Sequence, residues 1–303
     1  MIPEREAVAN AYLEHLTTAD LDLLLAGAPS APDDPLGRRS LVRAHPGGVE
    51  ELLARPQAFD AVFGPAGGAE PFVSVSPFLA FAVAVQRVAV ELQSASYVSE
   101  WLGPGVRTPV FDVAELRDFL AAPRRRLFLA ELLASYTHVA SGSVVVQTRR
   151  GWRRQRFSEL DPVRLAGLLE VVSEAELPGV LRRLGDVALF LTGVFPDHTA
   201  RQGFGPVEET RLLRAGGLSR PTGRQAEPAG AGAVGAMGAV GLLEQLGRRW
   251  YRGAFELLPR PVPGNVAVLG ELPERFGQAR RILNLVTERF LFRYRDRWFG
   301  AAG

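Results

Sequence analysis

The sequence contains no cysteine and no lysine. Without cysteine the chain cannot form disulfides, a thiolate nucleophile or a Cys-ligated zinc or iron–sulfur centre. Without lysine it has no Schiff-base chemistry, no lysine general base and no phosphate-loop lysine. All 35 residues in the combined Lys and Arg count are therefore arginines. These two absences exclude several large enzyme classes before any motif is considered.

Long apolar runs are also missing. No stretch reaches the ~18 consecutive apolar residues that a membrane-spanning helix needs. The first residues, MIPEREAVANAYLEHL, carry charges where a secretory signal has an apolar core. We therefore expect no membrane association and a cytoplasmic location.

The overall composition is that of a globular chain. Of the 303 residues, 47% are hydrophobic and 22% are charged, which is enough to bury a sizeable core. The net charge is only +2 although the pI is about 9.4, because arginine supplies all the basic side chains. The preference for Arg, Ala, Gly and Pro is typical of a GC-rich genome, so the high pI does not by itself predict a cationic surface.

The clearest helical pattern is LPGVLRRLGDVALFLTGVFPDHT, residues 177–199. Its apolar residues recur at steps of three and four, and from Val187 onward the other face is apolar too, which predicts a buried helix over 178–195. Pro178 suits the first turn, and Pro196 predicts the end of the helix. The sequence therefore places one helix inside the domain.

Asp186 interrupts this apolar run. A buried carboxyl group needs an ion pair or a hydrogen bond, because an unpaired buried charge costs several kcal/mol. Arg182 and Arg183 lie one turn earlier and are the nearest candidate partners. We predict a structural ion pair at this position.

A second buried helix is predicted at 77–98. Ser76 is a suitable N-cap and Pro77 suits the first turn. Arg87 and Glu91 are four residues apart and predict a second structural ion pair on one face. We expect the two buried helices to cross in the centre of the molecule, each with its own counter-charge.

The rest of the chain predicts a mainly α, helical bundle-like domain with one small β-hairpin at about 143–158. We expect a first helix over 3–25, short helices at about 47–63, and only an extended strip at 108–112. Residues 1–214 would form a helical core, and 238–303 would add helices to the same core. The Gly-, Ala- and Pro-rich residues 215–237 are predicted to be a flexible insertion, with a helix beginning near Ala236.

Three segments resemble a known group of proteins. These are LGDVALFLTGVFPDH at 184–198, GRRWYRGAFELL at 247–258 and ERFGQARRILNLVTERFLF at 274–292. Together they are similar to uncharacterised bacterial helical proteins with a Leu-Gly-Asp, Leu-Phe, Gly, Phe-Pro pattern. The resemblance covers about the C-terminal half and implies no activity. It does imply four framework positions, Gly185, Asp186, Gly193 and Pro196.

A metal site is one hypothesis, because carboxylate and histidine side chains on core helices build di-iron sites. The Glu-x-x-His spacing that marks those sites is missing, so satisfied ion pairs are the favoured interpretation and no cofactor is expected. The candidate ligands are Glu91, Glu131, His138, Asp186 and His198.

Arginines surround a tryptophan at the predicted hairpin tip. Guanidinium groups bind phosphate and an indole ring can stack on a base, so a nucleic-acid contact is a second hypothesis. The alternative is a solvated hairpin in a chain that uses Arg in place of Lys. The candidate residues are Arg149, Arg150, Trp152, Arg153, Arg154 and Arg156.

Three further patterns have simpler interpretations. Asp197 and His198 are adjacent and seldom form a dyad in that arrangement, so Asp197 is predicted to cap the next turn. The glycines at 229–241 lack a preceding strand and a following lysine, which excludes a phosphate loop. The aromatic residues of RYRDRWF, 293–299, are either core or a surface for a partner or a second copy of the chain.

These observations rank three functions. A non-enzymatic interaction or regulatory protein, with a protein partner or a second copy of the chain, comes first because no catalytic motif is recognised. An Arg-rich nucleic-acid-binding protein is the first alternative, and a metal-dependent helical-bundle enzyme is the second.

Overall fold

The computed structural model describes residues 4–26, 34–44, 48–64, 75–137, 141–148, 151–158, 160–217, 231–262 and 266–299. Within these ranges the chain is mostly helical and also contains two small antiparallel hairpins. The mainly α fold predicted from the sequence is confirmed.

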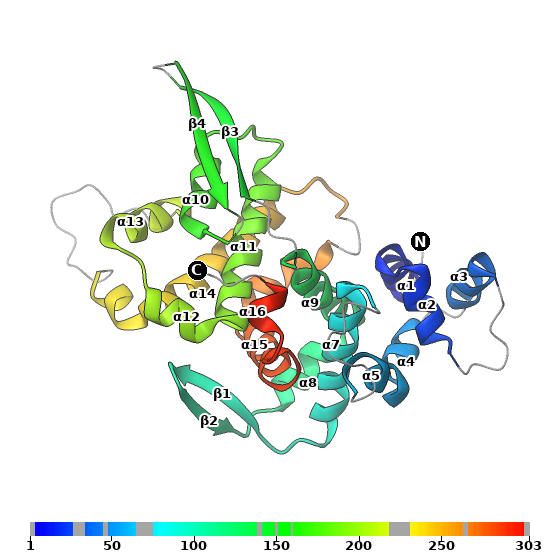
Figure 1. Ribbon diagram of the computed structural model, residues 1–303. Helices are drawn as coiled ribbons and strands as arrows, with labels where there is room; N and C mark the ends of the chain where they lie inside the picture. The colour runs from blue at the N-terminus through cyan, green and yellow to red at the C-terminus, as the bar shows by residue number, and fades with distance from the viewer. Residues whose placement is uncertain are drawn as a thin grey trace.

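Five short helices form the N-terminal part of the molecule, on the right in Figure 1. The predicted first helix over 3–25 is wrong, because Thr17 and Asp20 form a capping box that starts a new helix. Asp20 is buried and also accepts a hydrogen bond at 2.9 Å from the backbone N–H of Ser76, which ties this part to the core. The helices are α1 (Glu4–His15), α2 (Thr18–Leu24), α3 (Pro35–Ala44), α4 (Gly48–Ala54) and α5 (Pro56–Phe63).

The two predicted core helices are present and buried. Helix α7 (Pro77–Ser94) packs on α8 (Ala114–Ala121) and α9 (Pro123–Ser135). Ser76 caps α7 by accepting a hydrogen bond from the Leu79 N–H at 3.1 Å. Helix α7 is four residues shorter than predicted, because the chain leaves it at Ser94 to enter a strand.

Helix α11 (Leu177–Val194) is the other core helix. It packs on α14 (Ala231–Glu256) and α15 (Leu272–Val286). The predicted crossing of α7 and α11 is wrong, because these helices make little direct contact and α9 and α15 each touch both. Within the described residues, α9 and α15 therefore link α7 to α11.

Aromatic side chains at the end of the chain fill the space between α7 and α11. Short helical turns, η4 (Thr287–Leu291) and α16 (Arg295–Trp298), lead into Phe299. The Phe299 ring stacks on Phe81 of α7 with centroids 5.7 Å apart and meets Phe190 of α11 edge-on at 5.0 Å. Trp298 and Phe299 are buried, so they belong to the core and do not form the partner surface that the sequence left open.

The predicted β-hairpin is formed by β3 (Ser141–Thr148) and β4 (Gly151–Ser158), and it projects from the body at the top of Figure 1. The sequence missed a second hairpin, β1 (Val98–Gly103) with β2 (Val106–Val110), where it predicted a helix end and an extended strip. Its strands are too short for a clear alternating pattern. The hairpin lies along α15 and α12, and Trp101 holds it there.

The remaining elements connect these layers. Pro196 ends α11 and begins α12 (Pro196–Gln202), and it is followed by α13 (Pro206–Ala215). The flexible insertion predicted at 215–237 lies mostly outside the described residues, but the backbone of 231–237 is already helical and α14 bends at Gly238, where φ is 63°. The short elements are α10 (Pro162–Ala166), η2 (Gly167–Glu170) and η3 (Ala267–Gly270).

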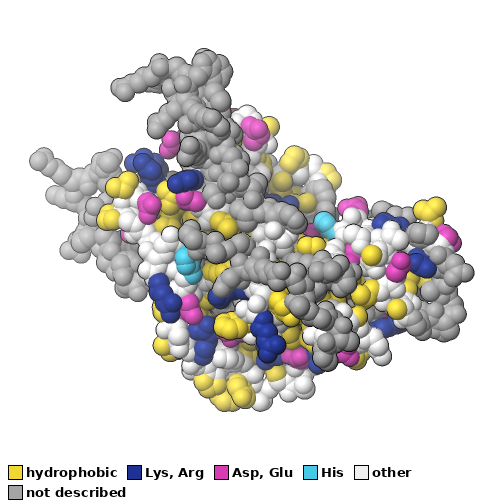
Figure 2. Space-filling model, viewed as in Figure 1, with side chains coloured by type: hydrophobic (Ala, Val, Ile, Leu, Met, Phe, Trp, Pro, Cys, Tyr) yellow, Lys and Arg dark blue, Asp and Glu magenta, His cyan; other side chains and the backbone are white. Residues whose placement is uncertain are grey.

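The surface carries both signs of charge. Figure 2 shows basic, acidic and apolar side chains side by side on the visible face, as the small net charge suggests. No helix in the described ranges combines the length and the apolar character that crossing a bilayer requires. On the face shown in Figure 2, the described residues therefore form no large patch of a single charge.

The packing of Phe299 can be tested by a matched pair of substitutions. Phe299→Ala should lower the free energy of unfolding by about 3 kcal/mol, because it leaves a cavity between α7 and α11. Phe292→Ala should change it by less than about 0.5 kcal/mol, because Phe292 is 67% exposed. Urea unfolding followed by far-UV circular dichroism measures both. Equal effects of the two substitutions would contradict this assignment of the C-terminal aromatics.

Candidate functional site

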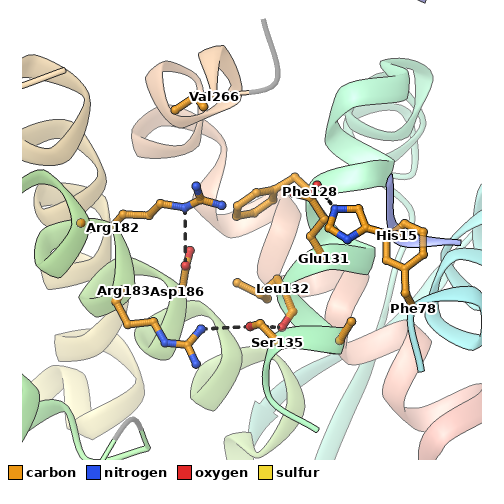
Figure 3. Close-up of a pocket in the computed structure, with 12 residues that line it drawn as sticks. His15, Phe78, Phe128, Glu131, Leu132, Ser135, Arg182, Arg183, Asp186 and Val266 are labelled. Carbon is orange, nitrogen blue, oxygen red and sulfur yellow. Dashed lines mark hydrogen bonds and ion pairs between the residues drawn. The ribbon is translucent and has the colours of Figure 1, made fainter. Parts of the chain in front are cut away.

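A pocket of about 580 Å³ opens where α1, α9 and α11 meet. Each of its two ends carries a basic side chain beside an acidic one. Figure 3 shows Arg182 and Asp186 of α11 on one side, the His15–Glu131 pair on the other, and Phe128 and Leu132 between them. The pocket thus has charged groups at both ends and apolar side chains between them.

Helix α14 fixes the α11 side of the pocket. A Cβ atom at Gly185 would lie 2.7 Å from the Tyr251 ring, which is closer than van der Waals contact allows. Glycine therefore permits the Tyr251 ring to lie on the α11 backbone, and its hydroxyl donates a hydrogen bond to Asp186 Oδ1 at 2.8 Å. The partner of Asp186 is a tyrosine from a distant segment, which the sequence analysis did not identify.

Burial controls the ionisation of this acid. It raises the pKa of Asp186 above the ordinary 3.8, although Arg182 and the Tyr251 hydroxyl favour the charged form. Burial also raises the pKa of Tyr251 well above 10.0, so that hydroxyl remains a donor. Asp186 therefore holds a proton at a higher pH than an exposed aspartate does.

Arg182 is the predicted partner of Asp186, but it is only loosely engaged. Its Nε lies 3.8 Å from Asp186 Oδ2, beyond hydrogen-bonding distance, and its side chain is 42% exposed. Among the described residues it has no other ion pair or hydrogen bond. Its guanidinium therefore faces the pocket with most of its donors available.

Arg183 is held more firmly at the same end. Its Nη1 donates to Ser135 Oγ at 2.9 Å, and its Cζ lies 4.0 Å from the centroid of the Tyr136 ring. Ser135 in turn donates to the Leu132 carbonyl at 2.8 Å. Ser135 is therefore a structural link between α9 and α11.

His15 and Glu131 form the other end. His15 Nε2 lies 3.0 Å from Glu131 Oε1, and the His15 ring packs against Phe78 with centroids 4.6 Å apart. The hydrogen bond to Glu131 raises the pKa of His15 above 6.5 against the opposing effect of burial. His15 is consequently charged over more of the neutral range than a free histidine.

The charges around the pocket favour an anion. Arg182, Arg183 and a protonated His15 carry three positive charges, whereas Asp186 and Glu131 carry at most two negative charges. With Asp186 protonated, positive charge exceeds negative charge. The arrangement can therefore bind an acidic group beside Arg182.

The structure does not assemble the predicted metal ligands. Glu91 of α7 accepts a hydrogen bond from Arg87 at 2.8 Å and also pairs with Arg289, so its charge is satisfied by arginines. Glu131 and Asp186 line the same pocket, but His198 lies in another one, and His138 is outside the described residues. Within the described ranges, no three His, Asp or Glu side chains are close enough to hold a metal ion.

Of the predicted nucleic-acid residues, Trp152, Arg153, Arg154 and Arg156 lie on β4. Trp152, Arg154 and Arg156 occupy alternate positions of β4, and Arg153 lies at an intervening position. In the hairpin register these three residues pair with Gln147, Val145 and Ser143 of β3. Arg149 and Arg150 lie outside the described residues. A nucleic-acid contact therefore stays a prediction.

Asp197 and His198 are adjacent in the sequence but contact different parts of the structure. Asp197 accepts a hydrogen bond from Trp101 Nε1 at 2.5 Å and lies 3.7 Å from Arg107. Burial opposes the ionisation of Asp197, but these partners outweigh it and the pKa is lower than usual. The predicted capping role of Asp197 is wrong, because it anchors the β1–β2 hairpin instead. His198 borders a separate pocket of about 510 Å³ beside α10 and α13.

Sequence reasoning missed His15, which lines the main pocket, and Tyr251, which holds Asp186 from behind it. His15 ends α1 and Tyr251 lies in α14, and neither belongs to a motif. A weak signal existed for Tyr251, because a buried acid at Asp186 demands a donor and Tyr251 lies within one of the segments that carry the family resemblance. No signal in one sequence relates His15 to Glu131, 116 residues later.

Comparison of the chain with protein-family models, with curated proteins and with solved structures gives no significant match. The site must therefore be interpreted from its own geometry.

The protonation of Asp186 predicts a pH-dependent stability difference. In the unfolded chain this acid ionises near 3.8, and in the folded chain it ionises at a higher pH. Its contribution to stability is thus fully present below the unfolded pKa and is lost as the pH rises through the folded pKa. Asn keeps an acceptor for Tyr251 but cannot ionise.

We therefore expect Asp186→Asn to gain stability relative to the natural chain as the pH rises from the ordinary aspartate pKa of 3.8 toward the higher pKa of the folded state. Urea unfolding at several pH values measures this difference. A difference that stays constant or falls with rising pH would show that the folded protein does not favour the protonated acid.

Proposed function

We propose that this chain is a non-enzymatic regulatory protein that binds a small anionic molecule in the pocket between α1, α9 and α11. One observation carries the proposal: the Arg182 guanidinium faces the pocket, and its nearest carboxyl group is 3.8 Å away and has a raised pKa. A cation so placed has donors to offer a ligand.

The position of the pocket supports a regulatory role. His15 comes from the N-terminal helices, Glu131 from α9 and Arg182 from the central helix α11. A ligand that contacts all three sides would hold the N-terminal helices against the core. Binding would thus stabilise one arrangement of the two parts by its differential affinity for it.

Binding without conversion is favoured by how the polar groups are engaged. Ser135 donates to a backbone carbonyl, Arg183 is fixed by Ser135 and Tyr136, and Tyr251 is buried behind Asp186. His15 is paired with Glu131. These contacts build a preorganised binding surface. A protein partner or a second copy of the chain, and a cytoplasmic location, remain part of the proposal as expectations from the sequence.

Anion binding can be tested by thermal unfolding in sodium acetate, sodium phosphate and sodium phenylacetate at constant ionic strength. At least one anion should raise the melting temperature in a saturable manner, because ligand binds the folded state only. Arg182→Gln should weaken the binding of that anion about ten-fold or more, since it removes a charge-assisted hydrogen bond.

Arg252→Gln is the matched control, because Arg252 is 53% exposed and pairs with Glu274 away from the pocket. It should leave the anion effect unchanged. If no anion shifts the melting temperature, or if the two arginine variants respond alike, the proposed pocket function is wrong.

A further inference from the structure

The volume of the pocket is informative about the ligand. At about 580 Å³ it falls in the range of roughly 300–1,000 Å³ that is usual for organic ligands. An inorganic ion beside Arg182 would leave most of that space to water. The anionic group is therefore better understood as one end of a larger molecule.

The walls between the two polar ends are apolar. Phe128 and Leu132 of α9 lie between Arg182 and the His15–Glu131 pair in Figure 3, and Val266 borders the pocket near Arg182. The Phe128 ring is itself held edge-on against Tyr251, with centroids 6.2 Å apart. An apolar ligand body would pack on a fixed aromatic surface and remove it from water.

The far end offers an acceptor. Glu131 receives one contact, from His15 to Oε1, and no partner of Oε2 occurs among the described residues. Its side chain is 25% exposed. A hydroxyl group on the ligand can donate to this oxygen. The pocket thus offers a cation at one end and a carboxylate acceptor at the other.

Resting on the proposed function, we infer that the ligand is a small organic acid with an apolar, ring-sized body and a hydrogen-bond donor at the end opposite its acidic group. The acid pairs with Arg182, the body lies on Phe128 and Leu132, and the donor reaches Glu131. A hydroxylated aromatic acid has this chemistry.

Isothermal titration calorimetry with four probes tests this assignment. Acetate supplies the acid alone, phenylacetate adds the ring, 4-hydroxyphenylacetate adds the donor, and phenethylamine replaces the acid by a cation. Phenylacetate should bind about ten-fold or more tighter than acetate, because the ring leaves water. The hydroxyl group should make 4-hydroxyphenylacetate bind several-fold tighter than phenylacetate. Phenethylamine should not bind measurably.

Two variants locate the binding. Glu131→Leu should abolish most of the advantage of 4-hydroxyphenylacetate over phenylacetate, because it removes the acceptor, while leaving phenylacetate itself within a few-fold. Gly179→Leu should block both acids, because a Cβ at Gly179 meets no atom within 4 Å and the side chain would enter the pocket. Gly179→Leu also tests whether the acids bind in this pocket if Arg182→Gln fails to fold. The Arg252→Gln control should bind as the natural chain does.

The outcomes separate the two proposals. If acetate and phosphate bind in an Arg182-dependent manner and phenylacetate is no tighter, the anion pocket stands and the ligand class is wrong. If neither acids nor phosphate bind, the proposed function itself is wrong. If phenethylamine binds and the acids do not, both are wrong. Binding of the acids that survives Gly179→Leu would place them outside this pocket and overturn the ligand assignment.

Discussion

The structure depends on the contact between α11 and α14 at Gly185. There the Tyr251 ring occupies the space that a side chain at Gly185 would need, and its hydroxyl donates to Asp186 at 2.8 Å. The contact satisfies a buried polar pair in an otherwise apolar interface, where an unmade hydrogen bond costs about 1–3 kcal/mol. One glycine thus permits the close packing, and one acid and one tyrosine fix its register.

The candidate pocket follows from this contact. Because Tyr251 holds Asp186 from behind, Arg182 has no close hydrogen-bonding partner on its own helix and faces the pocket instead. Tyr251 also lies against Phe128, which forms the apolar part of the pocket, and against Phe276 of α15. The same side chain therefore connects the core to the site. A change that displaced it would alter both, which makes stability and binding linked properties of this chain.

Periodicity in the sequence was sufficient to predict the two core helices, the break at Pro196 and the β3–β4 hairpin. It could not predict that α9 and α15 separate α7 from α11, because amphipathic patterns show which face is buried and not against which partner. Gly185 and Gly193 were predicted to be framework positions, and both lie at close contacts: a Cβ at Gly185 would lie 2.7 Å from the Tyr251 ring, and a Cβ at Gly193 would lie 2.7 Å from Leu283. Glu131 and Asp186 were candidate ligands in the metal hypothesis, and Asp186 was also predicted to pair with Arg182 or Arg183. Their actual partners, His15 and Tyr251, are 116 and 65 residues away in the sequence, so only the fold reveals them.

The most direct measurement is the free energy of unfolding of Gly185→Ala beside Gly179→Ala. Both change a glycine of the same helix to the better helix former. At Gly179 the added methyl group enters open space, so the variant should gain up to about 1 kcal/mol. At Gly185 it would meet the Tyr251 ring at 2.7 Å and should cost about 1–3 kcal/mol through overpacking. A Gly185→Ala protein as stable as Gly179→Ala would contradict the close contact from which the pocket and its chemistry are derived.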